Sequence, residues 1–469
     1  MILQEDSFST KRKALRINLD PNIYGTIAEI GGGQEVARAF FQAGGASGTI
    51  AKSISAYDKT FSDNLYNNNT KGRYVSKDRL EKMLGKEFND LTTLLPDTKD
   101  HRTRYFAFAN TVETLNYKKT NQGHGWMGVR FQLTPFSEPN EVIIHVKLLE
   151  DDASLQQYTL GSIGINLIYA CFNYAKYPNK FLLSLMENLS NDRIEINMAS
   201  MSGPELDFVD NRLLSIQLVK NGIASAVIFN KDGEVQQPSD MLYKKNVLAF
   251  RGSFRPITYA GIDMLKTSFN LFKKDKNYTK ENTVSICEIT LSNLLEQSAF
   301  DDSDFLDRID LLNGLGQNVL VSNFKEYYKL SQFFTKFKLN RLRLVLGIPA
   351  LKCVLNKKFY NDLQGGILES FANIFHDNVK IYTYPQLVDG KIIDSNNIEV
   401  DEENKYLYKH LKENRKIIDI ETYNEKYLPI YSKGVLDRIL NHEDGWEDDV
   451  PEFVANEIKS KRLFGYVPR

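Results

Sequence analysis

The sequence predicts an α/β protein whose main part is a (β/α)8-type barrel or, as the alternative, a doubly wound parallel sheet. Eight short runs rich in β-branched residues support this prediction, because amphipathic segments separate most of them. The runs are residues 142–149, 193–198, 224–230, 246–251, 284–290, 318–322, 342–347 and 379–384. Repeated strand–helix–strand units imply parallel strands with helical crossovers, and eight strands favour a barrel. The short connection between residues 230 and 246 keeps the open sheet as the alternative.

The chain is predicted to have three regions. Residues 1–140 form a Gly-rich α+β region, with a strand at 26–30 and helices at 34–42 and 76–95. Residues 141–385 form the repeated β/α domain, and residues 386–469 form a charged helical extension that ends in the apolar segment 463–467. The apolar run 163–172 is about half as long as the roughly 20 residues of a membrane-spanning helix, so we expect a buried helix there.

Composition narrows the class of protein. The 59 basic and 60 acidic side chains nearly cancel, which gives no sign of a nucleic-acid partner. The N-terminal residues contain no apolar core of a signal peptide, and no run is long enough to span a membrane. Cys171, Cys287 and Cys353 lie far apart, so we expect three buried thiols in a reducing compartment. These features predict a cytoplasmic protein without membrane contact.

Two glycine clusters are the most visible candidate site. Gly31, Gly32 and Gly33 separate the predicted strand from the predicted helix, and backbone N–H groups at such a turn can hold a phosphate or carboxylate. The second cluster, residues 44–48, leads to Lys52, whose charge could bind the same anion. Neither cluster matches a named phosphate-binding loop, so ordinary tight turns are the competing explanation.

Loops after the strands supply further candidates, because function in barrels gathers at the carboxyl ends of strands. Arg251 and Arg255 flank a Gly-Ser pair after the fourth run, and guanidinium groups bind phosphate or carboxylate through two hydrogen bonds. Gly365 and Gly366 precede a predicted helix and could form a late-strand phosphate site. Surface salt bridges and ordinary turns remain the alternatives for these two pairs.

Two residues are candidates for acid–base catalysis. Glu288 lies inside an apolar strand, and a buried carboxyl could act as a general base or a metal ligand. His124 is expected to lie in a flexible loop, residues 122–126, whereas His145 alternates with apolar residues and is expected to be a core histidine. The six histidines show no metal-ligand spacing, so no zinc site is predicted. Mg²⁺ is a possible cofactor at the acidic residues 150–152, where a solvated strand end is the alternative.

Several segments resemble a known family. Residues 24–37, 53–58, 251–256 and 364–371 look like a widespread bacterial family of uncharacterised cytosolic proteins, and the likeness spans nearly the whole chain. Members are often labelled TonB-dependent receptor or nicotinate-nucleotide adenylyltransferase. A receptor barrel would need many alternating strands of about ten residues, which this chain lacks. An adenylyltransferase would carry [HT]-x-G-H at its first strand-to-helix turn, and the nearest match here, residues 121–124, begins with Asn121. The resemblance therefore implies no catalytic residues.

These observations predict a cytosolic metabolic enzyme, possibly a transferase, that acts on a small anionic substrate, phosphorylated or nucleotide-like. Its cofactor is not predicted beyond Mg²⁺, and a homo-oligomer is possible. The alternative is a binding or assembly protein that uses the C-terminal extension. An enzyme should gather Lys52, Arg251, Arg255 and Glu288 in one pocket, whereas an assembly protein should leave them scattered.

Overall fold

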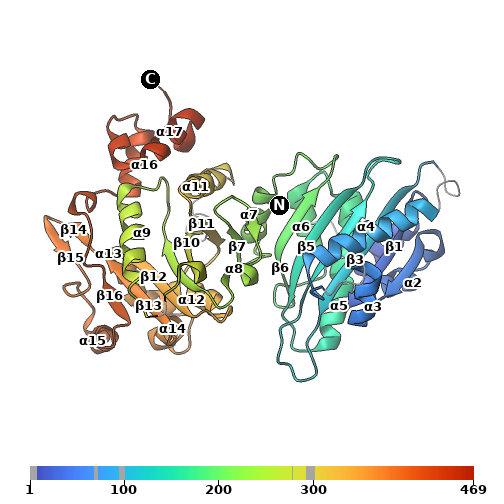
Figure 1. The fold of residues 1–469 in the computed structure, drawn as a ribbon, viewed down its shortest axis with the longest axis horizontal. Helices are drawn as coiled ribbons and strands as arrows, with labels where there is room; N and C mark the ends of the chain where they lie inside the picture. Colours follow the sequence, from blue (N-terminus) through green and yellow to red (C-terminus); the bar gives the residue numbers. More distant parts are fainter. Residues whose placement is uncertain (1–7, 68–71, 95–100, 277, 292–301, 469) are drawn as a thin grey trace. The chain divides into compact units, whose positions relative to one another are not determined.

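The computed structural model describes residues 8–67, 72–94, 101–276, 278–291 and 302–468. The chain divides between Ser225 and Ala226 into two compact units, unit 1 and unit 2 (Figure 1). Each unit has one large β-sheet of its own, and helices pack on the faces of that sheet.

Unit 1 contains a six-stranded sheet in the order β2-β1-β3-β4-β5-β6. β1 pairs in parallel with β2 and β3, whereas β3 to β6 pair antiparallel. The strands are β1 (Ile23–Gly31), β2 (Ile50–Ser55), β3 (Arg104–Glu113), β4 (His124–Phe131), β5 (Asn140–Leu148) and β6 (Ile194–Ser202). The helices are α1 (Thr10–Asn18), α2 (Glu35–Ala43), α3 (Lys59–Tyr66), α4 (Lys77–Leu94), α5 (Ala153–Asn173), α6 (Pro178–Leu185) and α7 (Asn211–Lys220).

Helices cover both faces of this sheet. α4 packs on one face, where Leu80 and Leu84 join a buried cluster with Ala28 and Ile30 of β1. α2 and α5 lie together on the other face. A Cβ at Gly161 of α5 would lie 2.6 Å from the Cβ of Glu35, so glycine permits this close packing. The predicted buried helix at 163–172 is confirmed as part of α5.

Unit 2 contains an eight-stranded sheet in the order β16-β13-β12-β9-β10-β11-β7-β8. Six strands are parallel, and numbering them along the chain gives the order 3-2-1-4-5-6 of a Rossmann-like sheet. The strands are β7 (Ala226–Phe229), β8 (Val235–Gln236), β9 (Asn246–Arg251), β10 (Thr283–Thr290), β11 (Asn318–Ser322), β12 (Arg341–Gly347), β13 (Val379–Tyr384) and β16 (Ile417–Asp419), with a separate hairpin β14 (Gln386–Val388) and β15 (Lys391–Ile393).

The helices of unit 2 follow the strands in alternation. They are α8 (Pro238–Leu242), α9 (Tyr259–Phe272), α11 (Asp302–Gly314), α12 (Tyr327–Thr335), α13 (Ile348–Leu355), α14 (Gly366–Ile374), α15 (Lys405–Glu413), α16 (Ser432–Leu440) and α17 (Glu452–Lys461). Apolar residues of α12, α13 and α14 form one core cluster with β9 to β13. α9 also packs against β9 and β12, and α11 packs against β11.

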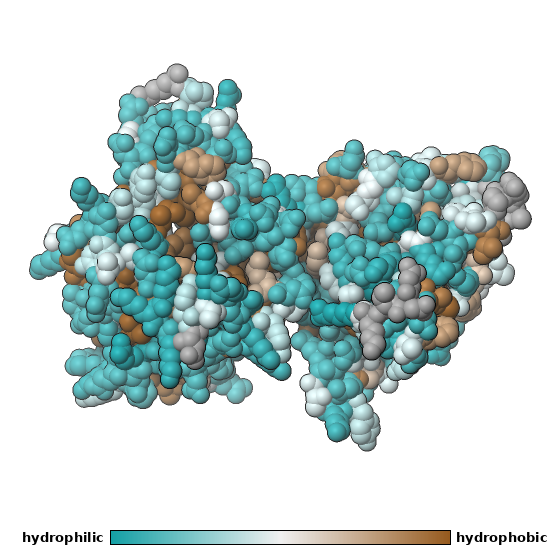
Figure 2. Space-filling model, viewed as in Figure 1, coloured by the Kyte–Doolittle hydropathy of each residue, from teal (hydrophilic) through white to brown (hydrophobic). Residues whose placement is uncertain are grey.

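The C-terminal segment packs on the carboxyl end of this sheet. The Ser432 hydroxyl, at the start of α16, donates to the Pro256 carbonyl (2.9 Å) and accepts from the Arg255 backbone N–H (3.2 Å). The apolar segment 463–467 is partly internal, because Leu463 and Phe464 are buried and lie in η7 (Leu463–Gly465), which contacts α16 and α11. On the face seen in Figure 2, both units are mainly hydrophilic, with apolar side chains in small patches.

All eight predicted runs are strands, but the barrel prediction is wrong for the described residues. The first two runs, β5 and β6, pair antiparallel in unit 1. The third, β7, pairs antiparallel with β11, and the other five lie parallel in unit 2, where the doubly wound alternative is confirmed. The predicted boundary after residue 140 falls at the first residue of β5, which pairs with β4. A sequence in which strands and helices alternate does not specify which strands pair or in which direction. Here two helices separate β5 and β6, and the two strands nevertheless pair antiparallel.

Candidate functional site

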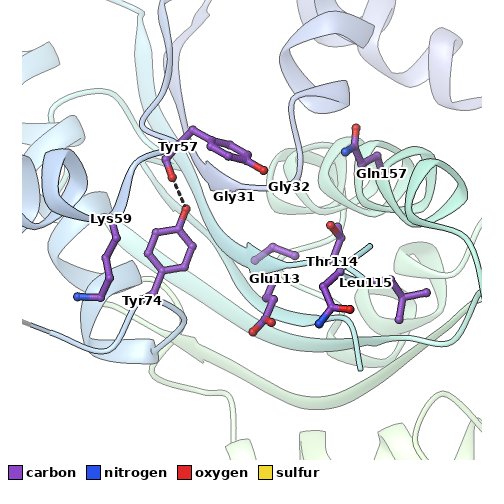
Figure 3. Close-up of a pocket in the computed structure, with 11 residues that line it drawn as sticks. Gly31, Gly32, Tyr57, Lys59, Tyr74, Glu113, Thr114, Leu115 and Gln157 are labelled. Carbon is purple, nitrogen blue, oxygen red and sulfur yellow. Dashed lines mark hydrogen bonds between the residues drawn. The ribbon is translucent and has the colours of Figure 1, made fainter. Parts of the chain in front are cut away.

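A pocket of about 530 Å³ opens at the carboxyl ends of the parallel strands β1 and β3 in unit 1 (Figure 3). Its lining residues come from the turn after β1, the segment between β2 and α3 with the start of α3, the segment before α4, the end of β3 with the residues that follow it, and helix α5. They are Gly31, Gly32, Tyr57, Lys59, Tyr74, Val112, Glu113, Thr114, Leu115, Asn116 and Gln157. Ligands of α/β sheets bind at such strand ends, so this pocket is the candidate site.

The glycine turn that was predicted from the sequence forms part of this pocket. Gly31 and Gly33 have φ values of 79° and 114°, which residues with a Cβ rarely adopt. A Cβ at Gly31 would lie 1.9 Å from the carbonyl oxygen of Val112, so only glycine allows β1 to end against β3. The Gln34 side-chain amide donates to the Gly31 carbonyl (2.5 Å) and holds the turn in front of α2.

Two tyrosines form one side of the pocket, and Gln157 lies on the other (Figure 3). The Tyr74 hydroxyl donates to the backbone carbonyl of Tyr57 (2.8 Å), which ties the two residues together. The Tyr57 side chain remains 75% exposed, so its ring is open to a ligand. Sequence analysis missed both residues, because tyrosines outside a motif carry no distinctive signal.

Lys59 adds a cation at the edge of the pocket. Its ammonium group lies 2.9 Å from Asp63, and the same carboxylate also binds Arg79. Hydrogen bonds from Lys59 and Arg79 lower the pKa of Asp63. Two cations around one carboxylate leave this trio with a net charge of +1, while the Glu113 carboxylate also lines the pocket.

Two buried polar side chains lie beside the glycine turn. Glu29 of β1 and Asn110 of β3 are directly paired in the sheet, and a Cβ at Gly33 would meet the Asn110 amide nitrogen at 2.0 Å. Among the residues that the structure describes, Glu29 Oε1 and both polar atoms of the Asn110 side chain have no hydrogen-bond partner. Burial raises the pKa of Glu29 to about 8, against a hydrogen bond from the Ala37 backbone that lowers it. A carboxyl within the apolar run of β1 was the signal that could have identified Glu29.

His124, the predicted catalytic histidine, lies next to the pocket. It is directly opposite Glu113 in the antiparallel pair β3–β4, and Glu113 lines the pocket. Residues so paired have Cβ atoms about 5 Å apart on one face of the sheet. His124 Nδ1 lies 3.3 Å from His145 Nε2, and His145 Nδ1 lies 2.6 Å from Asn197 Oδ1. His145 is buried, as predicted for a core histidine.

The other predicted residues of the anion site do not join this pocket. Lys52 of β2 forms an ion pair with the buried Glu87 (2.5 Å). Arg251, Arg255 and Glu288 belong to unit 2, and none of them lines this pocket. Gly365 and Gly366 precede α14, and the Gly365 N–H donates to the Glu369 carboxylate (2.8 Å).

Arg251 and Glu288 bind each other at the carboxyl ends of β9 and β10. Arg251 Nε donates to Glu288 Oε2 (2.5 Å) and Nη2 donates to Oε1 (2.9 Å), while the Ser322 hydroxyl also donates to Glu288 (2.5 Å). Glu288 is fully buried, and the Arg251 guanidinium lies 4.5 Å above the Tyr327 ring. Much of the hydrogen-bonding capacity of both groups is therefore used within the protein.

Arg255 also binds a carboxylate of the chain. Its Nε donates to Asp304 Oδ1 (2.7 Å), and Asp304 is shared with the buried Arg308.

A smaller pocket of about 270 Å³ in unit 2 is lined by Arg251, Tyr327 and Cys353, among others. The prediction of three buried thiols is wrong for Cys353, which is exposed. An amphipathic helix such as α13 has an outward face, and the sequence pattern alone did not assign this cysteine to it.

The acidic residues 150–152 do not converge on one point. Glu150 accepts from Arg193 Nε (2.7 Å), Asp151 pairs with Lys119 (3.2 Å), and Asp152 caps the start of α5. Among the residues that the structure describes, no three His, Cys, Asp or Glu side chains form a group that could hold a metal ion. In the same part of the chain, none of the helices combines the length and apolarity needed to cross a bilayer.

No protein-family model and no curated protein matches this chain. A competence/damage inducible protein from Agrobacterium tumefaciens is similar in structure over 34% of this chain and 94% of its own, with 15% identity and a TM-score of 0.25. A Plasmodium falciparum nicotinic acid mononucleotide adenylyltransferase is similar over 48% of this chain and 98% of its own, with 14% identity and a TM-score of 0.29. These likenesses are distant, and at such TM-scores they carry no argument about the site.

Proposed function

We propose that this protein is an enzyme that binds a small, nucleotide-like anionic molecule in the unit 1 pocket. The observation that carries the proposal is the position of the pocket. It lies at the carboxyl ends of parallel strands, where the Gly31–Gly32 turn precedes helix α2 and two tyrosines stand beside it. Backbone N–H groups at a strand-to-helix turn bind phosphate, and tyrosine rings stack on flat heterocycles.

Each part of such a ligand has a corresponding part of the pocket. The anionic group would lie near the glycine turn, with Lys59 adding positive charge at the edge. The exposed Tyr57 ring would pack against the planar group. Glu113 and His124, paired across β3 and β4, would transfer protons to or from the reacting atoms. The pocket could thus combine binding with acid–base catalysis.

The test is a thermal-shift and calorimetric screen of the full chain with mononucleotides, dinucleotides, phosphosugars, inorganic phosphate and divalent ions. A ligand at a hundred times its Kd stabilises the folded state by about 2.7 kcal/mol. We expect a mononucleotide to bind, and Tyr57→Ala and Lys59→Ala to weaken its binding.

Two matched substitutions serve as controls. Tyr117→Ala removes a fully exposed tyrosine outside the pocket, and Lys52→Ala removes a lysine that pairs with Glu87. Both should leave the affinity unchanged. A mononucleotide shift that survives Tyr57→Ala and Lys59→Ala, or no shift with any compound, would contradict the proposal for this pocket.

A further inference from the structure

Three polar side chains form a chain of contacts across the antiparallel part of the unit 1 sheet. Asn197 of β6, His145 of β5 and His124 of β4 come from adjacent strands. Asn197 Oδ1 lies 2.6 Å from His145 Nδ1, and His145 Nε2 lies 3.3 Å from His124 Nδ1. His145 is 2% exposed, and its ring packs edge-on against Trp126, with 4.8 Å between ring centroids. The chain of contacts therefore leads from the buried sheet to the strand end beside the pocket.

The side-chain oxygen of Asn197 determines which ring nitrogens of His145 and His124 carry protons. A carbonyl oxygen can only accept, so His145 Nδ1 carries a proton and donates it to Asn197. Burial lowers the pKa of His145 to about 3, and the nearby charges of Lys147 and Arg73 act in the same direction. A neutral His145 that is protonated at Nδ1 has its lone pair on Nε2. His124 must then donate from Nδ1, and in the neutral ring of His124 the lone pair lies on Nε2.

We propose that Asn197 and His145 are positioning residues that hold His124 in its Nδ1–H tautomer. Nε2 is thereby the atom of His124 that accepts and returns a proton. The same logic of a base oriented by a buried partner occurs in catalytic triads. The catalytic meaning of this tautomer rests on the proposed function, but the tautomer itself does not, because it is a property of the protein without ligand.

The charged groups near the Asn197–His145–His124 contacts are compatible with proton transfer at His124 Nε2. Glu113 lies opposite His124, and its carboxylate accepts from the Asn121 side chain (2.7 Å). Lys147, also paired with His124 in the sheet, is balanced by Glu195 at 3.7 Å. A proton that reaches His124 Nε2 would therefore be next to a carboxylate that lines the pocket.

The experiment is a long-range ¹H–¹⁵N spectrum of the histidine rings in the full chain at pH 8, with His124 assigned through His124→Gln. We expect an Nδ1–H tautomer for His124 in the wild-type protein. Asn197→Leu should abolish this preference and give a mixture of tautomers, whereas Asn197→Asp, which keeps an accepting oxygen, should retain it. The signals of His376 and His410 in unit 2 should stay unchanged in every variant.

Either of two results would overturn the proposal. One is an Nε2–H tautomer of His124 in the wild-type spectrum, which needs no Asn197 variant to fold. The other is an unchanged His124 tautomer in a folded Asn197→Leu protein, which would show that Asn197 does not set it. If no nucleotide binds but the tautomer responds as expected, the proposed function fails and the positioning role stands.

Discussion

Two glutamates in apolar strands illustrate how differently one residue type can be accommodated. Glu288 is buried in unit 2 and receives two hydrogen bonds from Arg251 and one from Ser322. Glu29 is buried in unit 1, and one of its oxygens has no hydrogen-bond partner in the described part of the chain. Burial without a cation favours the neutral carboxyl, whereas burial beside a guanidinium favours the ion pair.

Glu29 should make unit 1 less stable as the pH rises. Its pKa is about 8 in the folded protein and 4.5 is its ordinary value, so the unfolded chain releases the proton first. The free energy of unfolding should therefore fall between these pH values. Glu29→Gln removes the ionisable group and with it this pH dependence. Relative to the wild-type protein, the variant should be more stable at pH 8, by up to about 5 kcal/mol, and should have no such advantage at pH 4. Urea unfolding followed through Trp126 fluorescence measures this; parallel pH profiles of the two proteins would contradict it.

Breaking the buried pair in unit 2 should cost stability at neutral pH. Arg251→Met leaves Glu288 buried without its cation, and such changes cost about 3 to 5 kcal/mol. The double variant Arg251→Met, Glu288→Gln should recover part of this loss, because no buried charge remains. Urea unfolding followed through Trp446 measures both variants. A single variant as stable as the wild-type protein would show that the pair does not hold β9 and β10 together.

At the scale of elements, the connection between β1 and α2 forms part of the pocket wall through Gly31 and Gly32. The turn must bring the backbone close to both Val112 and Asn110 of β3, and its glycines meet this requirement. The sequence indicated the turn, since three consecutive glycines between a strand and a helix are distinctive. It did not indicate that β3, about 80 residues later, supplies the opposing wall.

Gly33→Ala should therefore be more harmful than Gly44→Ala. Both positions have a positive φ, which costs about 1 to 2 kcal/mol for a residue with a Cβ. A Cβ at Gly33 also meets the buried Asn110 amide at 2.0 Å, whereas a Cβ at Gly44 would meet no described residue beyond its chain neighbours within 4 Å. The overlap should add about 1 to 3 kcal/mol. Thermal unfolding of the two variants gives the comparison, and equal losses would refute it.

At the scale of the whole molecule, the chain is built from two units that each have a complete sheet and core. The only two tryptophans are divided between them, with Trp126 in unit 1 and Trp446 in unit 2. This distribution allows the unfolding of each unit to be followed separately through Trp126→Phe and Trp446→Phe. The residues that line the candidate pocket all belong to unit 1, and the strands that position them pair only with other strands of unit 1.

We expect the fragments 1–225 and 226–469 each to fold on their own. Each should give far-UV circular dichroism and a cooperative unfolding transition, because each retains all strands of its sheet. Fragment 1–225 should also retain mononucleotide binding if the pocket has the proposed function. A fragment that lacks a cooperative transition would show that the units depend on each other for stability.

The sequence by itself determined where β1, the eight later strands, helices α2 and α4 and the glycine turn lie, because side-chain periodicity and glycine conformation act within a few residues. It did not predict β2, β3 or β16. All eight predicted strands in the second region are present. Only the tertiary structure decided that β5 and β6 belong to unit 1, that Arg251 binds Glu288, and that Asn197, His145 and His124 lie in contact. These outcomes depend on strand pairing between distant segments, and pairing is set by the packing of the whole sheet rather than by any local pattern.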